Sequence, residues 1–124
     1  MAPQRQAQAQ VSIQTSALIA VAASTPADFE FARPLASLSI TLVFFDVAGA
    51  VVTGGTADVV ASVNGVSGWL EIENGTYTAM PSGVSSRLEY GGGLYRLRLV
   101  GDAVAGAPVG ATHYQFEVVD GVPG

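Results

Sequence analysis

The stretch "LYRLRLVGDAVAGAPVGATHYQFEVVDG", residues Leu94–Gly121, decides the fold class of this chain. It contains two runs in which apolar and polar residues alternate, and the linker between them consists almost wholly of Gly, Ala, Val and Pro. A period of two places successive side chains on opposite faces of an extended chain, which is the pattern of a half-buried strand. The stretch therefore predicts two strands joined by a loop.

The same alternation recurs towards the N-terminus. It is strongest in "SLSITLVFFD", residues Ser37–Asp46, where β-branched and aromatic residues favour a strand. Residues 11–23 alternate in the same way, and we expect one strand there. The part of this run that reads "SALIAVAAST", residues 16–25, also fits the end of a cleaved signal peptide, and both interpretations stay open.

Two Asn-Gly pairs, Asn64-Gly65 and Asn74-Gly75, each lie between strand-like runs. Asn and Gly tolerate the positive φ angles of a type I′ turn, so each pair predicts a tight hairpin. The expected result is a meander of three short strands at residues 59–63, 68–73 and 76–80.

No segment shows the period of an amphipathic helix, and turn residues recur about every 8 to 12 positions. This spacing predicts an all-β domain, either an Ig-like β-sandwich or a small barrel of about seven to nine antiparallel strands. The domain is expected to span residues 11–124. Residues 1–10, "MAPQRQAQAQ", are polar and low in complexity, and we predict a flexible N-terminal arm there.

The composition restricts the partners of this chain. Of its 124 residues only 12% are charged, none is Lys, and the net charge is −5. Nucleic-acid binding requires a basic surface, and anionic membranes repel an acidic chain, so neither partner is expected. No apolar run approaches the ~20 residues of a membrane-spanning helix. A chain so poor in charge is expected to bury surface against other proteins, which favours a homo-oligomer.

Candidate catalytic residues are few. His113 is the only histidine, and Glu117, the acid on its strand face, lies roughly 13 Å further along. Glu71 and Glu73 are ~6.6 Å apart beside Trp69, a spacing that resembles a glycosidase pair but comes from one strand with no cleft implied. We interpret His113, Glu71 and Glu73 as solvated strand residues, and we expect no enzyme activity.

Metal and cofactor sites are not expected either. The chain has no cysteine, and its glycine-rich runs lack the strand-to-helix setting of a phosphate loop. The remaining acids near turns do not form a calcium-binding loop and are expected to cap backbone N–H groups. These acids are Asp46, Asp58, Asp102 and Asp120.

Arg96 and Arg98 are the best candidates for contact with a partner, because they share one strand face and a guanidinium binds carboxylates through two hydrogen bonds. The alternative is that both pair across the sheet with Glu117 or Glu89. The polar N-terminal arm and the only tryptophan complete the set. The predicted partner-binding residues are Gln4, Arg5, Gln6, Gln8, Gln10, Trp69, Arg96 and Arg98.

Two segments resemble small all-β structural proteins of tailed bacteriophages, in which an F-D-x-x-G-x-V-V-T turn and a closing G-A-T-H-Y strand recur. The segments are "SITLVFFDVAGAVVTGG" and, after a glycine-rich meander and "YRLRLVGD", "GATHYQFEVVDG". The resemblance covers roughly two-thirds of the chain. The matching residues are Phe45, Asp46, Gly49, Val51, Val52 and Thr53, and then Gly110, Ala111, Thr112, His113 and Tyr114.

The resemblance implies a non-enzymatic virion protein that is assembled in the host cytoplasm. A capsid decoration or head-stabilising subunit that binds neighbouring capsid subunits is the first expectation, and a tail, collar or head-fibre component is the second. The resemblance also implies a homo-oligomer such as a trimer, in which the arm, residues 1–10, reaches a neighbour and residues 11–23 add as a strand to another sheet. A different class also fits the composition: a secreted carbohydrate-binding or adhesion module with Trp69, Tyr77 and Tyr90 as stacking residues.

Overall fold

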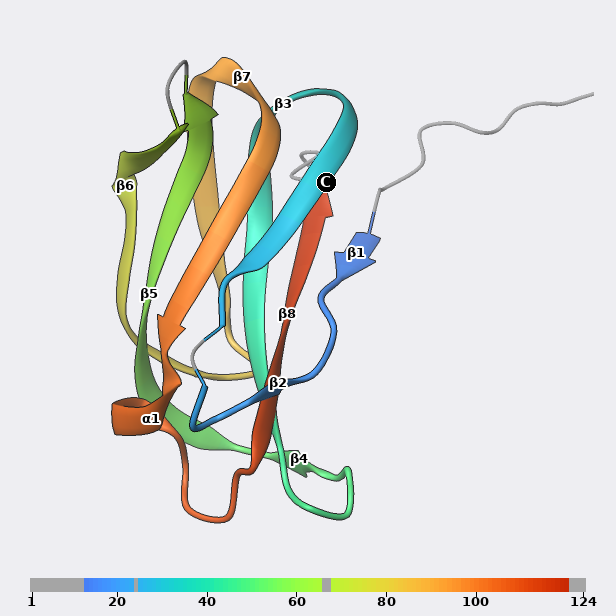
Figure 1. Ribbon diagram of the computed structural model, residues 1–124, viewed down its shortest axis with the longest axis vertical. Helices are drawn as coiled ribbons and strands as arrows, with labels where there is room; N and C mark the ends of the chain where they lie inside the picture. Colours follow the sequence, from blue (N-terminus) through green and yellow to red (C-terminus); the bar gives the residue numbers. More distant parts are fainter. Residues whose placement is uncertain (1–12, 24, 66–67, 121–124) are drawn as a thin grey trace, which may run out of the picture.

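The computed structural model describes residues 13–23, 25–65 and 68–120. Within these ranges the chain forms eight strands and one helical turn (Figure 1). Their bounds are β1 Ile13–Thr15, β2 Ile19–Ala20, β3 Ala27–Phe45, β4 Val51–Val52, β5 Gly54–Gly65, β6 Gly68–Ser82, β7 Ser85–Asp102, α1 Ala103–Gly106 and β8 His113–Asp120. The predicted all-β class is confirmed. The predicted arm, residues 1–10, lies outside the described residues.

All the strands belong to one antiparallel sheet that curls into a half-barrel (Figure 1). The order of the main strands is β1-β8-β3-β7-β5-β6, and the short β2 and β4 pair with β8 and β3. The opening stretch therefore forms β7 and β8, but the two strands are not neighbours, because β3 lies between them.

The sheet bends where β3 and β7 change register. Glu30 lies opposite Arg96, but the next pair is Leu35 with Leu94, so β3 carries three more residues than β7 at this point. A second shift lies between the pairs Leu35–Leu94 and Ser37–Glu89, where β7 carries three more residues than β3. Bulges of this kind bend a strand and increase its twist. Pro34 and Gly93 lie at these corners: Gly93 has φ +80°, and a Cβ added to it would lie 3.0 Å from the Pro34 ring. The corners thus bend two long strands where the sequence predicted strand ends.

The core follows the alternation that the sequence showed. Leu38, Ile40, Leu42 and Phe44 on β3 are buried, and so are Leu97 and Leu99 on β7. On β8 every second residue is buried, and the rings of Tyr114 and Phe116 meet edge to face with centroids 5.6 Å apart. Tyr95 alternates with Leu97 and Leu99 in the sequence, yet Tyr95 is 58% exposed, because it lies next to the corner at Gly93.

The predicted meander is confirmed in its first hairpin, which β5 and β6 form, but its second turn and third strand are wrong. The first hairpin closes between Gly65 and Gly68, so β5 continues through Asn64-Gly65 before the chain turns. Asn74-Gly75 is not a turn at all and lies inside β6, in a bulge against β5. The cause is close packing: a Cβ on Gly75 would lie 2.9 Å from the Cβ of Ala61, so glycine lets β6 approach β5 here.

Residues 13–23, the described part of the 11–23 run, do not form the single strand that was expected. Within them only β1 and β2 pair with β8, and the interruption begins at Ser16. The Ser16 N–H donates to the Phe116 carbonyl at 2.9 Å, and the Ser16 hydroxyl accepts from the Phe116 N–H at 3.0 Å. A side-chain hydroxyl therefore replaces the backbone carbonyl in the ladder, which ends regular pairing.

Candidate functional site

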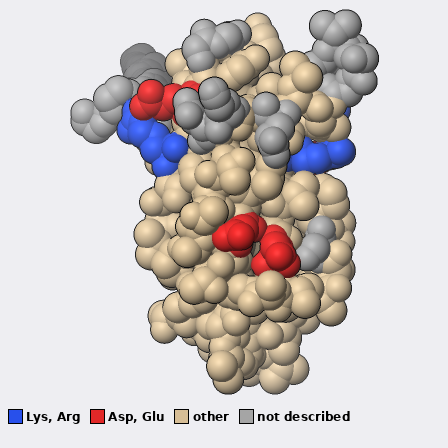
Figure 2. Space-filling model, turned by 90° about the vertical axis from the view of Figure 1, so that its left-hand side faces the viewer, with Lys and Arg blue, Asp and Glu red and all other residues tan. Residues whose placement is uncertain are grey.

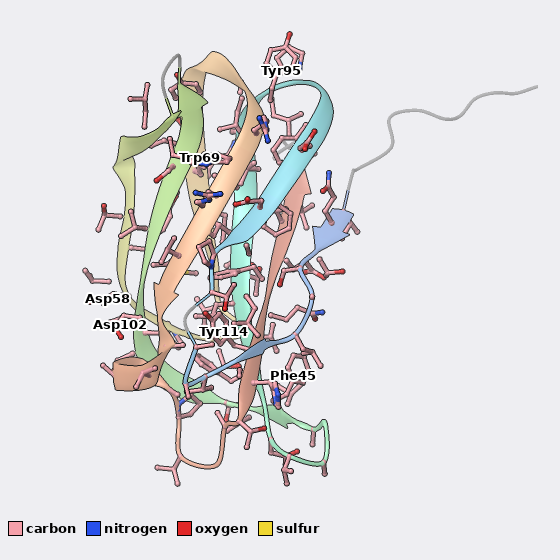
Figure 3. All side chains as sticks on the ribbon, in the orientation of Figure 1. Phe45, Asp58, Trp69, Tyr95, Asp102 and Tyr114 are labelled. Carbon is pink, nitrogen blue, oxygen red and sulfur yellow. The ribbon has the colours of Figure 1, made fainter. Side chains whose placement is uncertain are left out.

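Trp69, labelled in Figure 3, forms one cluster with Arg96 and Arg98 of β7 on the outer face of the sheet. The guanidinium carbon of Arg98 lies 4.3 Å from the centroid of the Trp69 ring, and that of Arg96 lies 5.6 Å from it. Trp69 belongs to β6, so its ring reaches across β5 to β7. A cation over an indole face is attracted by the negative charge of the ring face. Three residues predicted to bind a partner are thus brought together.

The acidic partners of these arginines come from the first half of β3. Arg98 donates from Nε to Asp28 Oδ1 at 2.7 Å and from Nη2 to Oδ2 at 2.9 Å. Arg96 Nη2 lies 3.8 Å from Glu30 Oε2. The hydrogen bond from Arg98 lowers the pKa of Asp28 from its usual value, and the same contact raises the pKa of Arg98.

The predicted pairing of these arginines with Glu117 or Glu89 is wrong. Glu89 pairs with Arg87 on its own strand at 3.1 Å. Glu117 lies on β8, opposite Thr15 and Thr41, in the other part of the sheet. The register of β3 against β7 decided the pairs, and the alternation along β7 contained no information about that register.

Arg96 and Arg98 differ in how far their guanidinium groups are already engaged by acidic partners. Arg98 uses both ends of its fork on Asp28, whereas Arg96 has only the longer contact and is 45% exposed. Beside Arg96 lies a small cavity of about 200 Å³. Tyr, Trp and Arg are the residue types that contribute most to binding at protein interfaces. The Trp69–Arg96 surface, as we name it, consists of Trp69, Tyr90, Tyr95, Arg96 and Arg98.

A second surface lies where the two segments that carry the phage resemblance meet. Asp46 Oδ1 accepts the N–H groups of Ala48 and Ala50, both at 2.9 Å, and Gly49 has φ +87° in the turn between them. The Thr112 N–H donates to the Phe45 carbonyl at 2.8 Å, so the second segment docks on the first. These motif residues therefore shape a turn and set a register.

The same contacts frame an apolar cavity of about 400 Å³, which we name the β3–β4 patch. Val47 at its rim is 88% exposed and Leu18 is 59% exposed. His113 lines it, half-buried, with Nδ1 3.0 Å from the Thr112 hydroxyl. The patch is lined by Leu18, Phe45, Asp46, Val47, Gly49, His113 and Gln115. The high apolar content of the sequence indicated exposed apolar residues, but only the fold showed that they gather in this patch.

Carboxylates do not gather into a metal site in the part of the chain that the structure describes. Asp58 and Asp102 lie opposite each other on β5 and β7 (Figure 3), and Asp58 also accepts the Ala79 N–H at 3.0 Å. On the face shown in Figure 2, a small acidic patch lies in the middle of a broad area without other charge. The side chains of Glu71 and Glu73 lie outside what the structure describes.

The aromatic residues considered for sugar stacking do not form one row. The Tyr77 hydroxyl donates to the Arg87 carbonyl at 3.1 Å, and the Tyr77 ring packs against the core. Tyr90 lines the small cavity beside Arg96, whereas neither Trp69 nor Tyr77 does. The five predicted contact residues of the arm, Gln4, Arg5, Gln6, Gln8 and Gln10, lie outside the described residues.

Comparisons with known proteins found no matching family model, curated protein or solved structure. Across the described ranges, no helix is long and apolar enough to cross a membrane.

Proposed function

We propose that this chain is a non-enzymatic structural subunit of a tailed-bacteriophage virion, one that decorates and stabilises the head by binding neighbouring capsid subunits. The observation that carries the proposal is the β3–β4 patch. There, the two segments that resemble phage structural proteins pack together and leave Val47 and Leu18 open to solvent beside an apolar cavity. Exposed apolar clusters of this kind mark protein interaction sites.

The rest of the surface supports the same function. It is poor in charge over the face in Figure 2, and the Trp69–Arg96 surface adds the side chains typical of interface hot spots. A subunit that contacts several neighbours gains affinity by multivalency, so each contact can be small. The alternatives are a tail, collar or head-fibre position in the same virion, and a secreted carbohydrate-binding module.

The proposed function includes the Ig-like sandwich architecture that the sequence predicted. β3 pairs with β8 through its second half and with β7 along both halves, and β7 pairs with β5 through its second half. We infer that the corners in β3 and β7 fold the half-barrel towards an Ig-like two-layer sandwich, a scaffold that resists deformation at a capsid surface.

The test uses particles of the phage that encodes this chain, produced without it and then mixed with the purified protein. We expect the added protein to bind the heads and to raise the temperature at which they release DNA. The variant Val47→Asp should not bind, because a charge would be placed in the apolar patch. The control Val104→Asp changes an equally small exposed residue on α1, away from β4 (Figure 1), and should bind normally.

Electron microscopy of the same particles separates the alternatives. Density or antibody label on the tail or collar would place the chain there instead of on the head. Absence of binding to any part of the particle would overturn the virion assignment. A change in Trp69 fluorescence on addition of oligosaccharides would support the carbohydrate-binding module. Calorimetry should then detect binding to the native chain and none to Trp69→Phe.

A further inference from the structure

The first half of β3 is an open sheet edge. Residues Ala27–Glu30 pair with β7 on one side, and within the described residues no strand pairs with the other side. The Gln14 side chain donates from Nε2 to the Glu30 carbonyl at 2.8 Å, and Gln14 comes from β1. The Glu30 carbonyl therefore faces away from β7.

The direction of one carbonyl determines the direction of the others along this edge. Backbone groups two residues apart in a strand face the same side, so the N–H and C=O of Asp28 also face away from β7. The pairs Asp28–Arg98 and Glu30–Arg96 are then the non-hydrogen-bonded pairs of the ladder, whose side chains lie closest together. The short contacts from Arg98 to Asp28 agree with this assignment.

A cleft of about 590 Å³ lies along this edge. One wall is the start of β3, residues 25–28, and the opposite wall is the N-terminal segment, residues 15–20, which diverges from β3 in Figure 1. The buried Ile19 and Ala27 line it as well. An extended chain of four residues covers about 13 Å, close to the length of the open edge. The cleft thus combines the outward-facing backbone N–H and C=O of Asp28 with a lining of mostly small and apolar residues.

We propose that this cleft accepts residues 4–11 of a second copy of the chain, which add to β3 as an extra strand. The added backbone would hydrogen-bond to Asp28 and, just beyond the cleft, to Glu30, where it would replace the Gln14 side chain at the Glu30 carbonyl, as in other cases of β-strand addition. This inference goes beyond the proposed function, because it requires only copies of this chain and no other virion protein.

The sequence of the segment fits the cleft. Gln occupies positions 4, 6, 8 and 10, and Arg5, Ala7, Ala9 and Val11 occupy the alternate positions. In an extended chain the small residues share one face, which suits a cleft lined mostly by small and apolar residues, and the glutamines face solvent. Arg5 is the only charged side chain of the segment, and Glu30 on the edge of β3 is 76% exposed.

A second copy supplies the segment more readily than the same chain does. β1 runs from Ile13 to Thr15, where it meets the cleft, so residues 4–11 of the same chain would have to reverse direction just before Ile13 to enter it. Tight reversals of this kind require positive φ angles and favour Asn or Gly. Residues 8–13, "QAQVSI", contain no Gly, Asn, Asp or Pro. Exchange between two copies needs no such turn.

The experiment compares the full chain with a variant that lacks residues 2–12, by light scattering across a hundredfold range of concentration. We expect the full chain to form a dimer or a larger closed assembly, and the shortened chain to stay monomeric. Amide hydrogen exchange should show at least tenfold slower exchange at Asp28 and Glu30 in the assembly. The amides of Ala27 and Phe29, which face β7, should be protected in both forms.

Proline substitutions in the segment provide the matched variants. Gln8→Pro with Ala9→Pro removes one backbone donor of each orientation and should abolish association without altering the folded domain, whereas Ala2→Gly should associate normally. A peptide of residues 2–12 should bind the shortened chain and protect Asp28 and Glu30, and a scrambled peptide should not. Equal masses of the full and shortened chains, or association without protection at Asp28 and Glu30, would overturn the proposal. Protection in a monomer would assign the cleft to the chain's own segment instead.

Discussion

Arg98 holds Asp28 in a two-pronged ion pair, with Nε 2.7 Å from Oδ1 and Nη2 2.9 Å from Oδ2. The two residues are 70 positions apart in the chain. The pair aligns the start of β3 with the end of β7 and keeps the guanidinium 4.3 Å from the centroid of Trp69. It therefore joins the open edge of the sheet to the Trp69–Arg96 surface.

This ion pair predicts a specific dependence of stability on pH. Arg98 lowers the pKa of the Asp28 carboxyl in the folded protein. A carboxyl of this kind stabilises the fold above its unfolded pKa of about 3.9, and the contribution is lost as the pH falls through the lower folded value. We expect Asp28→Asn to be less stable than the native chain at pH 7 and the difference to shrink below pH ~4.

Urea unfolding from pH 2 to pH 7 measures this difference. Glu89→Gln is the control, because Glu89 pairs with Arg87 on the same strand and both side chains are more than half exposed. Exposed pairs contribute little, so Glu89→Gln should change stability less at pH 7. A difference for Asp28→Asn that does not vary with pH would contradict the assignment.

Tyr114 predicts a stabilising substitution. Its side chain is fully buried, and its hydroxyl has no hydrogen-bond partner among the described residues. A buried hydroxyl without a partner costs about 1 to 3 kcal/mol, so Tyr114→Phe should raise the free energy of unfolding by about 1 kcal/mol. Chemical denaturation provides the measurement. Tyr95→Phe, on an exposed ring, should be neutral, and a loss of stability in Tyr114→Phe would show that the hydroxyl is satisfied.

Gly106 and Gly49 predict two different costs of adding a methyl group. A Cβ on Gly106 would overlap the backbone of Thr56 and Ala57, whereas Gly49 has open space but φ +87°. Gly106→Ala should lose about 3 kcal/mol or fail to fold, since backbone cannot move aside as a side chain can. Gly49→Ala should lose only about 1 to 2 kcal/mol, the cost of a left-handed residue with a side chain. Equal unfolding midpoints for the two variants would be inconsistent with this packing of α1 on β5.

The backbone conformation of Ala79 predicts that a glycine at this position of β6 increases stability. It has φ +54° in a bulge of β6, the only non-glycine residue with positive φ in the described part of the chain. Relief of about 1 to 2 kcal/mol of left-handed strain exceeds the entropic cost of glycine, so Ala79→Gly should gain about 0.5 to 1 kcal/mol. Thermal unfolding should show a higher midpoint for Ala79→Gly and a lower one for the neighbour Thr78→Gly. A lower midpoint for both would show that the bulge carries no strain.

Much of the fold was predictable because strand faces are local information. The alternation from Leu38 to Phe44 and from Tyr114 to Val118 correctly named the buried residues, since each side chain direction depends only on its neighbours in the chain. The Asn-Gly pairs predicted the wrong turn positions, because a local turn preference competes with the pairing of β5 and β6. At Asn74-Gly75 the packing of Gly75 on Ala61 decided the outcome.

The sequence by itself determined the all-β class, the strand faces and the residue types available for contact: a lone tryptophan, arginines without lysine, and little other charge. Only the tertiary structure decided that Trp69 meets Arg98, that Arg98 pairs with Asp28, and that an open edge lies beside a cleft. The physical reason is that alternation specifies which way a side chain points but not which strand lies next to it. The register between β3 and β7, set by two corners far apart in the chain, carries that information.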